Sequence, residues 1–256
     1  MNFEEILAAV SAPRLTYYSQ YLNCNTNPSK VGAYYSFLEL SGKFFPLIQL
    51  IEVSLRNSIH QIAATHYKNA RWYEVHPTSE KSKLLVSNAI QKARSELNSV
   101  PTPDDIVSRL TLGFWVYMLD SEYRDTKSPC YLWTPENKKK VFSNARNAWG
   151  AELSIKAIFE EFQQVLNLRN RLFHHEPIWK KHGCNSLDIA VNNVMKNYDF
   201  LLKILAFISP AKIKLLTAMK TPENFKSECT IARVNAIIQE LVGLEVPKEL
   251  ATEATV

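Results

Sequence analysis

The stretch LNLRNRLFHHEPIW, residues 166–179, holds the side chains of this chain that are best suited to chemistry: Arg169, Asn170, His174 and His175. A histidine titrates near neutral pH, so it can take the proton of a ribose 2′-hydroxyl or protonate a leaving 5′-oxygen. An arginine can hold a phosphate through two parallel hydrogen bonds and stabilise the charge of the transition state. An asparagine can orient either group. These residue types suit RNA cleavage, and they need no metal ligands.

A helix from about residue 154 to His174 or His175 must position these side chains. At about 100° per residue, Arg169 falls in the middle of the apolar face, and His174 lies about 140° away from it. Both can reach one phosphate only if the helix unwinds near His174, or if a twofold-related copy supplies the other half. Pro177 favours unwinding, because it disfavours the helical conformation at the residue before it.

The same four residues also have a purely structural interpretation. An arginine in an apolar face can pair with a buried carboxylate. Two histidines at the C-terminal end of a helix can interact favourably with the helix dipole. The spacing alone leaves both interpretations open.

A second helix, within residues 34–67, is expected to break or begin at Pro46. It carries Glu52, Arg56 and His60 at intervals of four residues, hence on one face. Glu52 and Arg56 either form an intrahelical pair or reach the 169–175 motif and support it. Arg56, Asn57 and His60 repeat the Arg-Asn…His order, but with only three residues between Arg56 and His60, so we do not interpret them as a second site.

Further basic and aromatic side chains admit two interpretations each. Arg171, Lys180 and Lys181 lie next to the motif and could hold an RNA backbone, or could simply form a solvated basic surface. The tryptophans could stack on bases or pack in the core; they are Trp115, Trp133 and Trp179.

The composition is that of a globular, mainly helical protein. Of 256 residues, 46% are hydrophobic and 21% charged, and only 6 are glycine. Glycine-rich phosphate loops are absent. A net charge of +5 permits an anionic partner without requiring one. The four cysteines are far apart and lack zinc-site spacing. We therefore expect reduced thiols, and we expect no metal, no cofactor and no membrane span. We also expect a cytoplasmic location, because the acidic start MNFEEILAAV lacks the basic region of a signal peptide.

Other helices are expected from apolar periodicity and capping signals, and no strand signal is strong. Asp104 or Asp105 is expected to cap the helix that contains LTLGFWVYML (110–119), and residues 125–140 are expected to be a connection. The remaining expected helices lie in residues 3–22, 80–98, 186–208 and 230–242.

LRNRLFHHEPIW resembles the signature of the Abi-like (abortive infection) proteins of the HEPN superfamily. Nucleases of that superfamily carry an arginine, a polar residue that is often asparagine, and a histidine after four to six intervening residues. Here four residues separate Arg169 from His174, and five separate it from His175. Three further segments resemble the family in the same order, so the likeness covers roughly residues 14–180; they are LIQLIEVSLRNSIHQIAATHYKNARWY (47–73), LTLGFWVYML (110–119) and LW (132–133).

The resemblance implies an all-α HEPN-type bundle with additional helices, a single domain over residues 1–256 and a homodimer that brings two motifs together. Residues from about 186 to 256 have no assigned role. It also implies a metal-independent endoribonuclease toxin of abortive-infection or toxin–antitoxin type, which cleaves RNA by 2′-hydroxyl attack and leaves a 2′,3′-cyclic phosphate. A protein or RNA antitoxin would be a further partner. The alternative is a catalytically inactive HEPN-fold module that binds RNA or protein.

Residue roles follow from the same resemblance. Arg169 would hold the phosphate, His174 would be the general acid or base, and Asn170 would orient them. His175 would assist His174 or substitute for it. Glu52 and Arg56 would support the motif.

Overall fold

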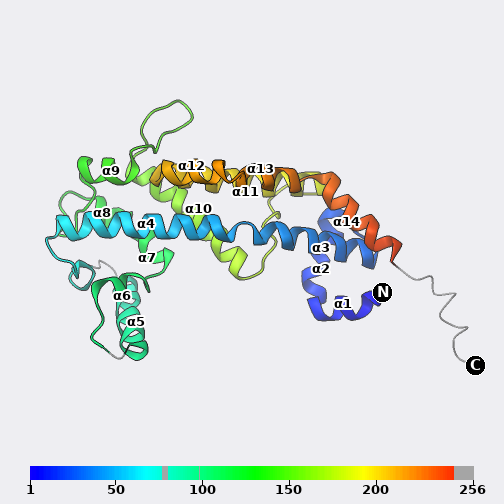
Figure 1. The fold of residues 1–256 in the computed structure, drawn as a ribbon, viewed down its shortest axis with the longest axis horizontal. Helices are drawn as coiled ribbons and strands as arrows, with labels where there is room; N and C mark the ends of the chain where they lie inside the picture. The colour runs from blue at the N-terminus through cyan, green and yellow to red at the C-terminus, as the bar shows by residue number, and fades with distance from the viewer. Residues whose placement is uncertain (77–79, 98, 245–256) are drawn as a thin grey trace, which may run out of the picture. The chain divides into compact units, whose positions relative to one another are not determined.

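The structure is a computed structural model that describes residues 1–76, 80–97 and 99–244 (Figure 1). The regular secondary structure in these ranges is helical, and an isolated bridge between Arg146 and Glu152 is their only β-type pairing. The prediction of an all-α fold is confirmed. No helix in these ranges has a stretch long and apolar enough to cross a membrane. The HEPN identity and the homodimer stay predictions.

The chain divides into two compact units, each assembled from separate segments. The first unit comprises Met1–Phe45, Arg171–Phe200 and the described part of Leu216–Val256, and the second comprises Pro46–Asn170 and Leu201–Leu215. Every crossing from one unit to the other falls inside a helix. The single domain over residues 1–256 stays a prediction, and each unit is described here by itself.

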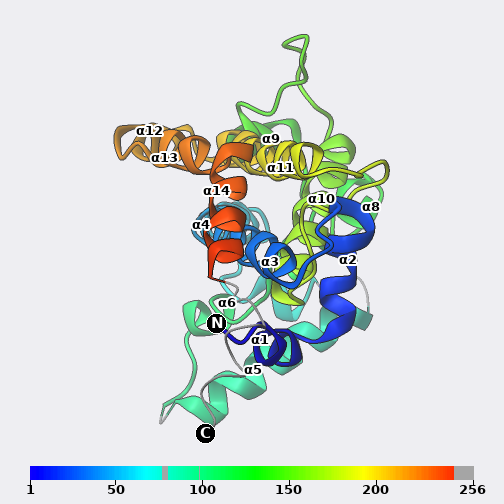
Figure 2. The same cartoon turned by 90° about the vertical axis from the view of Figure 1, so that its right-hand side faces the viewer.

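Helices from both ends of the chain build the first unit. The complete ones are α1 (Phe3–Val10), α2 (Ala12–Leu22), α3 (Asn27–Gly42), α13 (Thr221–Glu228) and α14 (Ile231–Gly243). Parts of α10 (Ile155–Phe173), α11 (Leu187–Ile208) and α12 (Pro210–Ala218) complete it. Helices α3 and α14 lie side by side (Figures 1 and 2). Gly32 permits this approach, because a Cβ atom there would lie 2.9 Å from the Cα of Ile238.

Aromatic rings fill the core of the first unit. Tyr198 and Phe225 stack with their centroids 3.6 Å apart, and Phe44 meets both rings edge-on. The rings of Tyr18 and Trp179 form a second contact, at 5.3 Å. The large rings bring segments that are distant in the sequence into one core, since such side chains bury the most apolar surface.

The second unit is built around the long helix α4 (Phe45–His66), most of which belongs to it. Pro46 lies in the first turn of α4, as predicted. The apolar stripe of this helix is buried, which confirms the periodicity of Ile48, Ile51, Leu55, Ile59 and Ile62. The other elements are the 3-10 helix η1 (Trp72–Glu74), α5 (Glu80–Glu96), α6 (Pro103–Val107), α7 (Leu112–Tyr117), α8 (Ser121–Arg124), α9 (Pro135–Phe142) and parts of α10 to α12.

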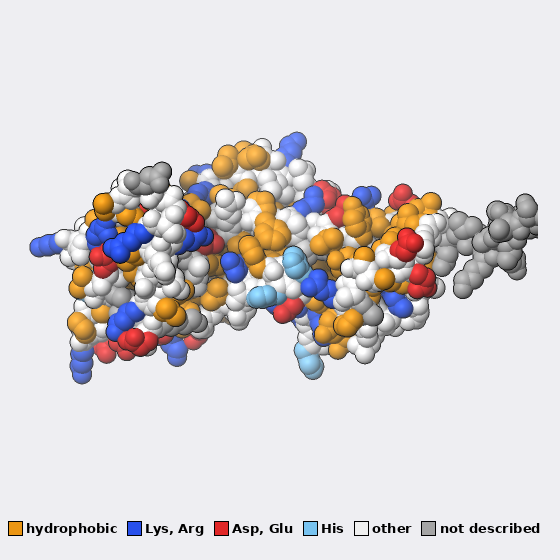
Figure 3. All heavy atoms as spheres, turned by 90° about the horizontal axis from the view of Figure 1, so that it is seen from below, with side chains coloured by type: hydrophobic (Ala, Val, Ile, Leu, Met, Phe, Trp, Pro, Cys, Tyr) orange, Lys and Arg blue, Asp and Glu red, His pale blue; other side chains and the backbone are white. Residues whose placement is uncertain are grey.

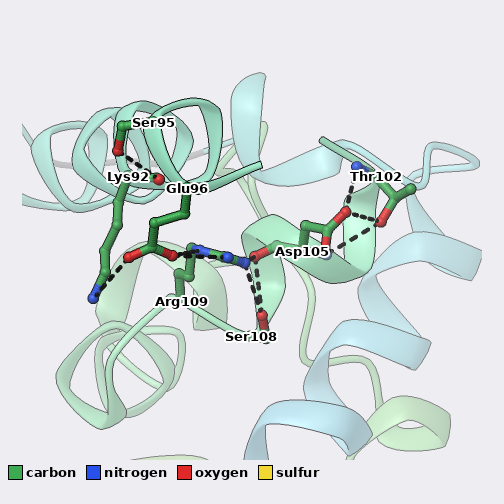
Figure 4. Close-up of polar contacts among 7 residues, drawn as sticks. All are labelled: Lys92, Ser95, Glu96, Thr102, Asp105, Ser108 and Arg109. Atoms are coloured by element: carbon green, nitrogen blue, oxygen red, sulfur yellow. Dashed lines mark hydrogen bonds and ion pairs between the residues drawn. The ribbon is translucent and has the colours of Figure 1, made fainter. Parts of the chain in front are cut away.

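The predicted cap at Asp104 or Asp105 is wrong, because the helix within residues 110–119 is α7, and its N-cap is Thr111. The helix that begins near Asp104 is the short α6, and its N-cap is Thr102 (Figure 4). The Thr102 hydroxyl accepts the N–H of Asp105 at 3.3 Å, and the Asp105 carboxylate accepts the N–H of Thr102 at 2.8 Å. This reciprocal pair is a capping box, so Asp105 is its third helical residue. Arg109 then ties α6 to α5 through Glu96, at 2.9 Å.

The expected connection over residues 125–140 is also partly wrong, because α9 begins at Pro135. Thr134 is the N-cap, and its hydroxyl accepts the N–H of Asn137 at 3.1 Å. A threonine followed by a proline is a readable signal for a helix start, since proline lacks the N–H that the first turn leaves unpaired.

Candidate functional site

The boundary between the two units cuts the predicted motif in half. Arg169 and Asn170 are the last residues of their segment of the second unit, and Arg171 begins the segment of the first unit that contains His174 and His175. The surroundings of each half are therefore described within its own unit.

Helix α10 ends at Phe173, one residue before the predicted end, and His174 and His175 form the turn that follows. The N–H of Glu176 donates to the carbonyl of Arg171 at 2.8 Å, and the N–H of His175 donates to that of Leu172 at 3.1 Å. This pair of bonds is a Schellman motif, and His175 occupies its left-handed position with φ of 56°. The predicted stop before Pro177 is confirmed, and its geometry is a helix cap.

Both histidine side chains are exposed. Neither imidazole forms a hydrogen bond or ion pair with any residue within the described ranges. Figure 3 shows histidine side chains at the surface of the face drawn. The ring nitrogens of His174 and His175 are thus accessible to a substrate.

The two histidines line a cavity of about 290 Å³. The aromatic residues around it come from α2, from α3, from the first residue of α4 and from the segment after α10; they are Tyr17, Tyr18, Tyr34, Phe37, Phe45 and Trp179. Arg14 is the one lining residue with a permanent positive charge, and Glu176 is the one acid. The cavity therefore joins a titratable pair to an aromatic wall.

The left-handed conformation of His175 gives a stability prediction. A residue with a Cβ atom is disfavoured there, so His175→Gly is expected to raise the free energy of unfolding by about 0.5 to 1 kcal/mol. Urea unfolding followed by circular dichroism measures this change. His182→Gly is the matched control, because His182 is also exposed but does not have a positive φ. A stability gain in the control, or none in His175→Gly, contradicts the role of His175 in the cap.

Arg171 holds the turn that follows the helix. Its guanidinium donates to the carbonyls of Pro177 and Lys180, the latter at 3.1 Å, and its Nε lies 3.6 Å from a carboxylate oxygen of Glu176. These contacts give Arg171 a structural function, whereas its predicted contact with RNA stays a prediction.

Lys180 and Lys181 have different surroundings within the first unit. The ammonium group of Lys180 lies 3.7 Å from the ring centroid of Tyr17 and 4.8 Å from that of Tyr21. This is a cation–π arrangement. Lys181 is exposed. Lys180 and Lys181 follow His175 by five and six residues in the chain, and their contact with RNA stays a prediction.

In the second unit, Arg169 is half-buried and donates to the side-chain oxygen of Asn170 at 3.3 Å. Burial raises the pKa of Glu52, and the positive charge of Arg169 opposes this shift more than any other group does. The backbone N–H of Leu112, at the start of α7, and the charge of Arg56 also lower the pKa of Glu52. Glu52 thus lies within electrostatic reach of the motif arginine.

Arg56 and His60 make local contacts. The Nε of Arg56 donates to the side-chain oxygen of Asn57 at 3.1 Å. The indole N–H of Trp72 donates to Nδ1 of His60 at 3.1 Å, and burial lowers the pKa of His60. A histidine whose Nδ1 accepts a hydrogen bond is neutral, and this bond holds the His60 ring against Trp72.

Two of the three tryptophans considered for base stacking are core residues of the second unit. Trp115 is buried and donates to the carbonyl of Leu110 at 3.2 Å, and Trp133 donates to that of Met118 at 2.6 Å. Trp179 is buried in the first unit but lines the cavity beside the histidines. All three side chains are buried, as the packing interpretation predicts.

The sequence analysis missed the aromatic side of the cavity. Arg14, Tyr17 and Tyr18 lie on α2, and Tyr34 and Phe37 lie on α3. The only signal is the tyrosine-rich stretch RLTYYSQYL (14–22), which by itself predicts an amphipathic helix. Only packing places these rings beside residues 174–179.

Among the described residues, no group of three or more His, Cys, Asp and Glu side chains is arranged to hold a metal ion. No protein-family model, no curated protein and no solved structure matches the chain.

Proposed function

We propose that this protein is a metal-independent endoribonuclease of the HEPN type that acts as a toxin in abortive infection or in a toxin–antitoxin pair. His174 is the general acid or base, Arg169 holds the scissile phosphate, Asn170 orients them, and His175 assists. The 2′-hydroxyl attacks the adjacent phosphorus, its proton passes to one base, and the 5′-oxygen leaves with a proton from an acid. The products are a 2′,3′-cyclic phosphate and a 5′-hydroxyl end.

The observation that carries this proposal is the pair of exposed histidines on the turn that directly follows α10. Their imidazoles form no hydrogen bond with any described residue, and they border a cavity. Packing alone does not require two exposed imidazoles at a helix end, whereas proton transfer does require accessible ring nitrogens. The Arg169-Asn170 pair lies near the end of α10, with three residues between Asn170 and His174.

The proposal includes a homodimer, because a twofold arrangement supplies two copies of the motif to one RNA site. It also includes an antitoxin, either protein or RNA, as the partner that keeps such an enzyme inactive in its own cell.

One observation favours the alternative, a binding module that does not cut. Arg169 is half-buried and is electrostatically coupled to Glu52, as an arginine in a structural ion pair would be. In that case the motif would maintain the fold, and the exposed basic residues would bind RNA or protein.

The test is incubation of the purified full-length protein with total RNA in excess EDTA. We expect fragments whose 3′ ends are 2′,3′-cyclic phosphates, because the attacking group is the neighbouring hydroxyl and no metal takes part. Analytical ultracentrifugation of the same sample should show a dimer at micromolar protein. Intact RNA that is nevertheless bound by the protein supports the binding module instead.

A further inference from the structure

The aromatic residues that line the cavity beside the histidine turn differ in how exposed they are. Tyr18, Phe37 and Trp179 are buried and form its floor, with the rings of Phe37 and Trp179 5.7 Å apart. Tyr34 is half-buried, and its ring meets that of Tyr18 edge-on at 6.0 Å. Phe45 is 39% exposed. Accessible rings above a rigid aromatic floor can accept a flat π-system by stacking.

The size of the cavity restricts what it can take. Its volume of about 290 Å³ is at the lower end of the roughly 300 to 1,000 Å³ range of ligand pockets. A single flat ring system fits this space better than an extended peptide or one face of a helix. The lining is mainly apolar, with polar groups at only a few positions, which is the usual composition of a small-ligand site.

The charges next to the cavity favour an anionic ligand. Arg14 lines it, and its guanidinium forms no hydrogen bond or ion pair with any residue in the described part of the chain. Lys180 lies over Tyr17, a lining residue, and adds a second positive charge. The only lining acid, Glu176, is already paired with Arg171 at 3.6 Å. An apolar segment of a second protein copy would not need these two cations.

We propose that this cavity is a stacking subsite for one unpaired nucleobase of single-stranded RNA, with Arg14 and Lys180 facing the flanking phosphates. The inference rests on the proposed function, since it names how that site holds its substrate. A base seated here lies beside His174 and His175, so the adjacent ribose comes within reach of the groups that transfer protons.

The test uses a short oligonucleotide with 2′-O-methyl groups throughout and one 2-aminopurine. It lacks the attacking hydroxyl, so binding is measured without cleavage. Wild-type protein should quench the 2-aminopurine fluorescence on binding, because stacking on aromatic rings does so. Tyr34→Leu should raise the Kd by about fivefold or more and reduce the quenching, because one stacking contact with the base is lost. Tyr35→Leu is the matched control, because Tyr35 is adjacent on α3, is 49% exposed and does not line the cavity.

Equal Kd and equal quench for the two variants, with both folded by circular dichroism, overturn the subsite. If Tyr34→Leu no longer dimerises but binds RNA with unchanged affinity, the subsite is also overturned. That result indicates that a second copy of the protein covers the cavity. These results are distinguishable from failure of the nuclease, which is measured by the wild-type cleavage of unmodified RNA. If binding quenches the fluorescence and depends on Tyr34, but wild-type protein does not cleave unmodified RNA, the proposed subsite is supported and the proposed nuclease activity is contradicted.

Discussion

His174→Ala is expected to reduce RNA cleavage by about 10²- to 10⁴-fold, the contribution typical of one general acid or base. The imidazole is exposed and forms no hydrogen bond with any described residue, so its removal should leave the fold unchanged. The backbone bonds of the Schellman turn come from His175 and Glu176 and do not use the His174 side chain. Cleavage rates in EDTA and toxicity on expression measure the effect.

Two variants serve as controls for this result. His182→Ala removes another exposed histidine of the first unit that does not line the cavity, and it should cleave as wild type. His175→Ala shows which of the two motif histidines is the principal acid or base, since the larger loss identifies it. A His174→Ala protein that remains fully toxic and cleaves RNA normally contradicts the assigned role.

Arg169→Ala is expected to reduce cleavage by about 10²- to 10³-fold, as the loss of one preorganised donor to a charged transition state typically does. Arg169→Lys should recover only part of this activity, because lysine keeps the charge but lacks the planar fork that binds a phosphate through two bonds. Normal cleavage by Arg169→Ala would leave only the structural interpretation for this residue. A shift from dimer to monomer in the ultracentrifuge would show that Arg169 also supports the interface.

The same variant should change the pH dependence of stability. The pKa of Glu52 is raised by burial, so Glu52 binds more protons in the folded state than in the unfolded state above its usual pKa of 4.5. The contribution of Glu52 to the free energy of unfolding is therefore fully present below pH 4.5. It is lost as the pH rises through the pKa that Glu52 has in the folded state. Arg169 opposes that rise, and its removal raises the Glu52 pKa further.

The destabilisation caused by Arg169→Ala should consequently grow as pH increases above about 4.5. Urea unfolding of wild type and variant at a series of pH values measures the difference. Glu52→Gln in the Arg169→Ala background removes the titrating group, so the pH-dependent part should disappear. A destabilisation that is the same at every pH contradicts the coupling between these two side chains.

His175 has a backbone conformation that glycine adopts more easily than histidine does. Glycine at position 175 should stabilise the helix end, yet the chain has a histidine there with φ of 56°. Residues held in disfavoured conformations are concentrated at functional sites, where the surrounding structure enforces them. The expected gain for His175→Gly therefore supports the proposed assisting role if activity falls at the same time.

Much of the fold followed from the sequence, because its causes are local. The apolar stripe of α4 from Ile48 to Ile62 repeats at helical spacing, and Pro177 ends α10. The cap of α6 shows the limit even of local reasoning. Thr102, Asp104 and Asp105 are all good capping residues, and only the bond from the Asp105 N–H to Thr102 decides which of them is the N-cap.

The sequence by itself determined the helical class, the spacing of Arg169-Asn170 and His174-His175, and the end of α10 shortly before Pro177. Tertiary structure decided which distant residues surround each half. Glu52 lies 117 residues before Arg169 in the chain, and Tyr34 lies 140 residues before His174. Burial of large apolar surfaces brings such segments together, and this depends on how whole helix faces fit rather than on any local pattern. The aromatic cavity and the effect of the Arg169 charge on Glu52 are products of that packing.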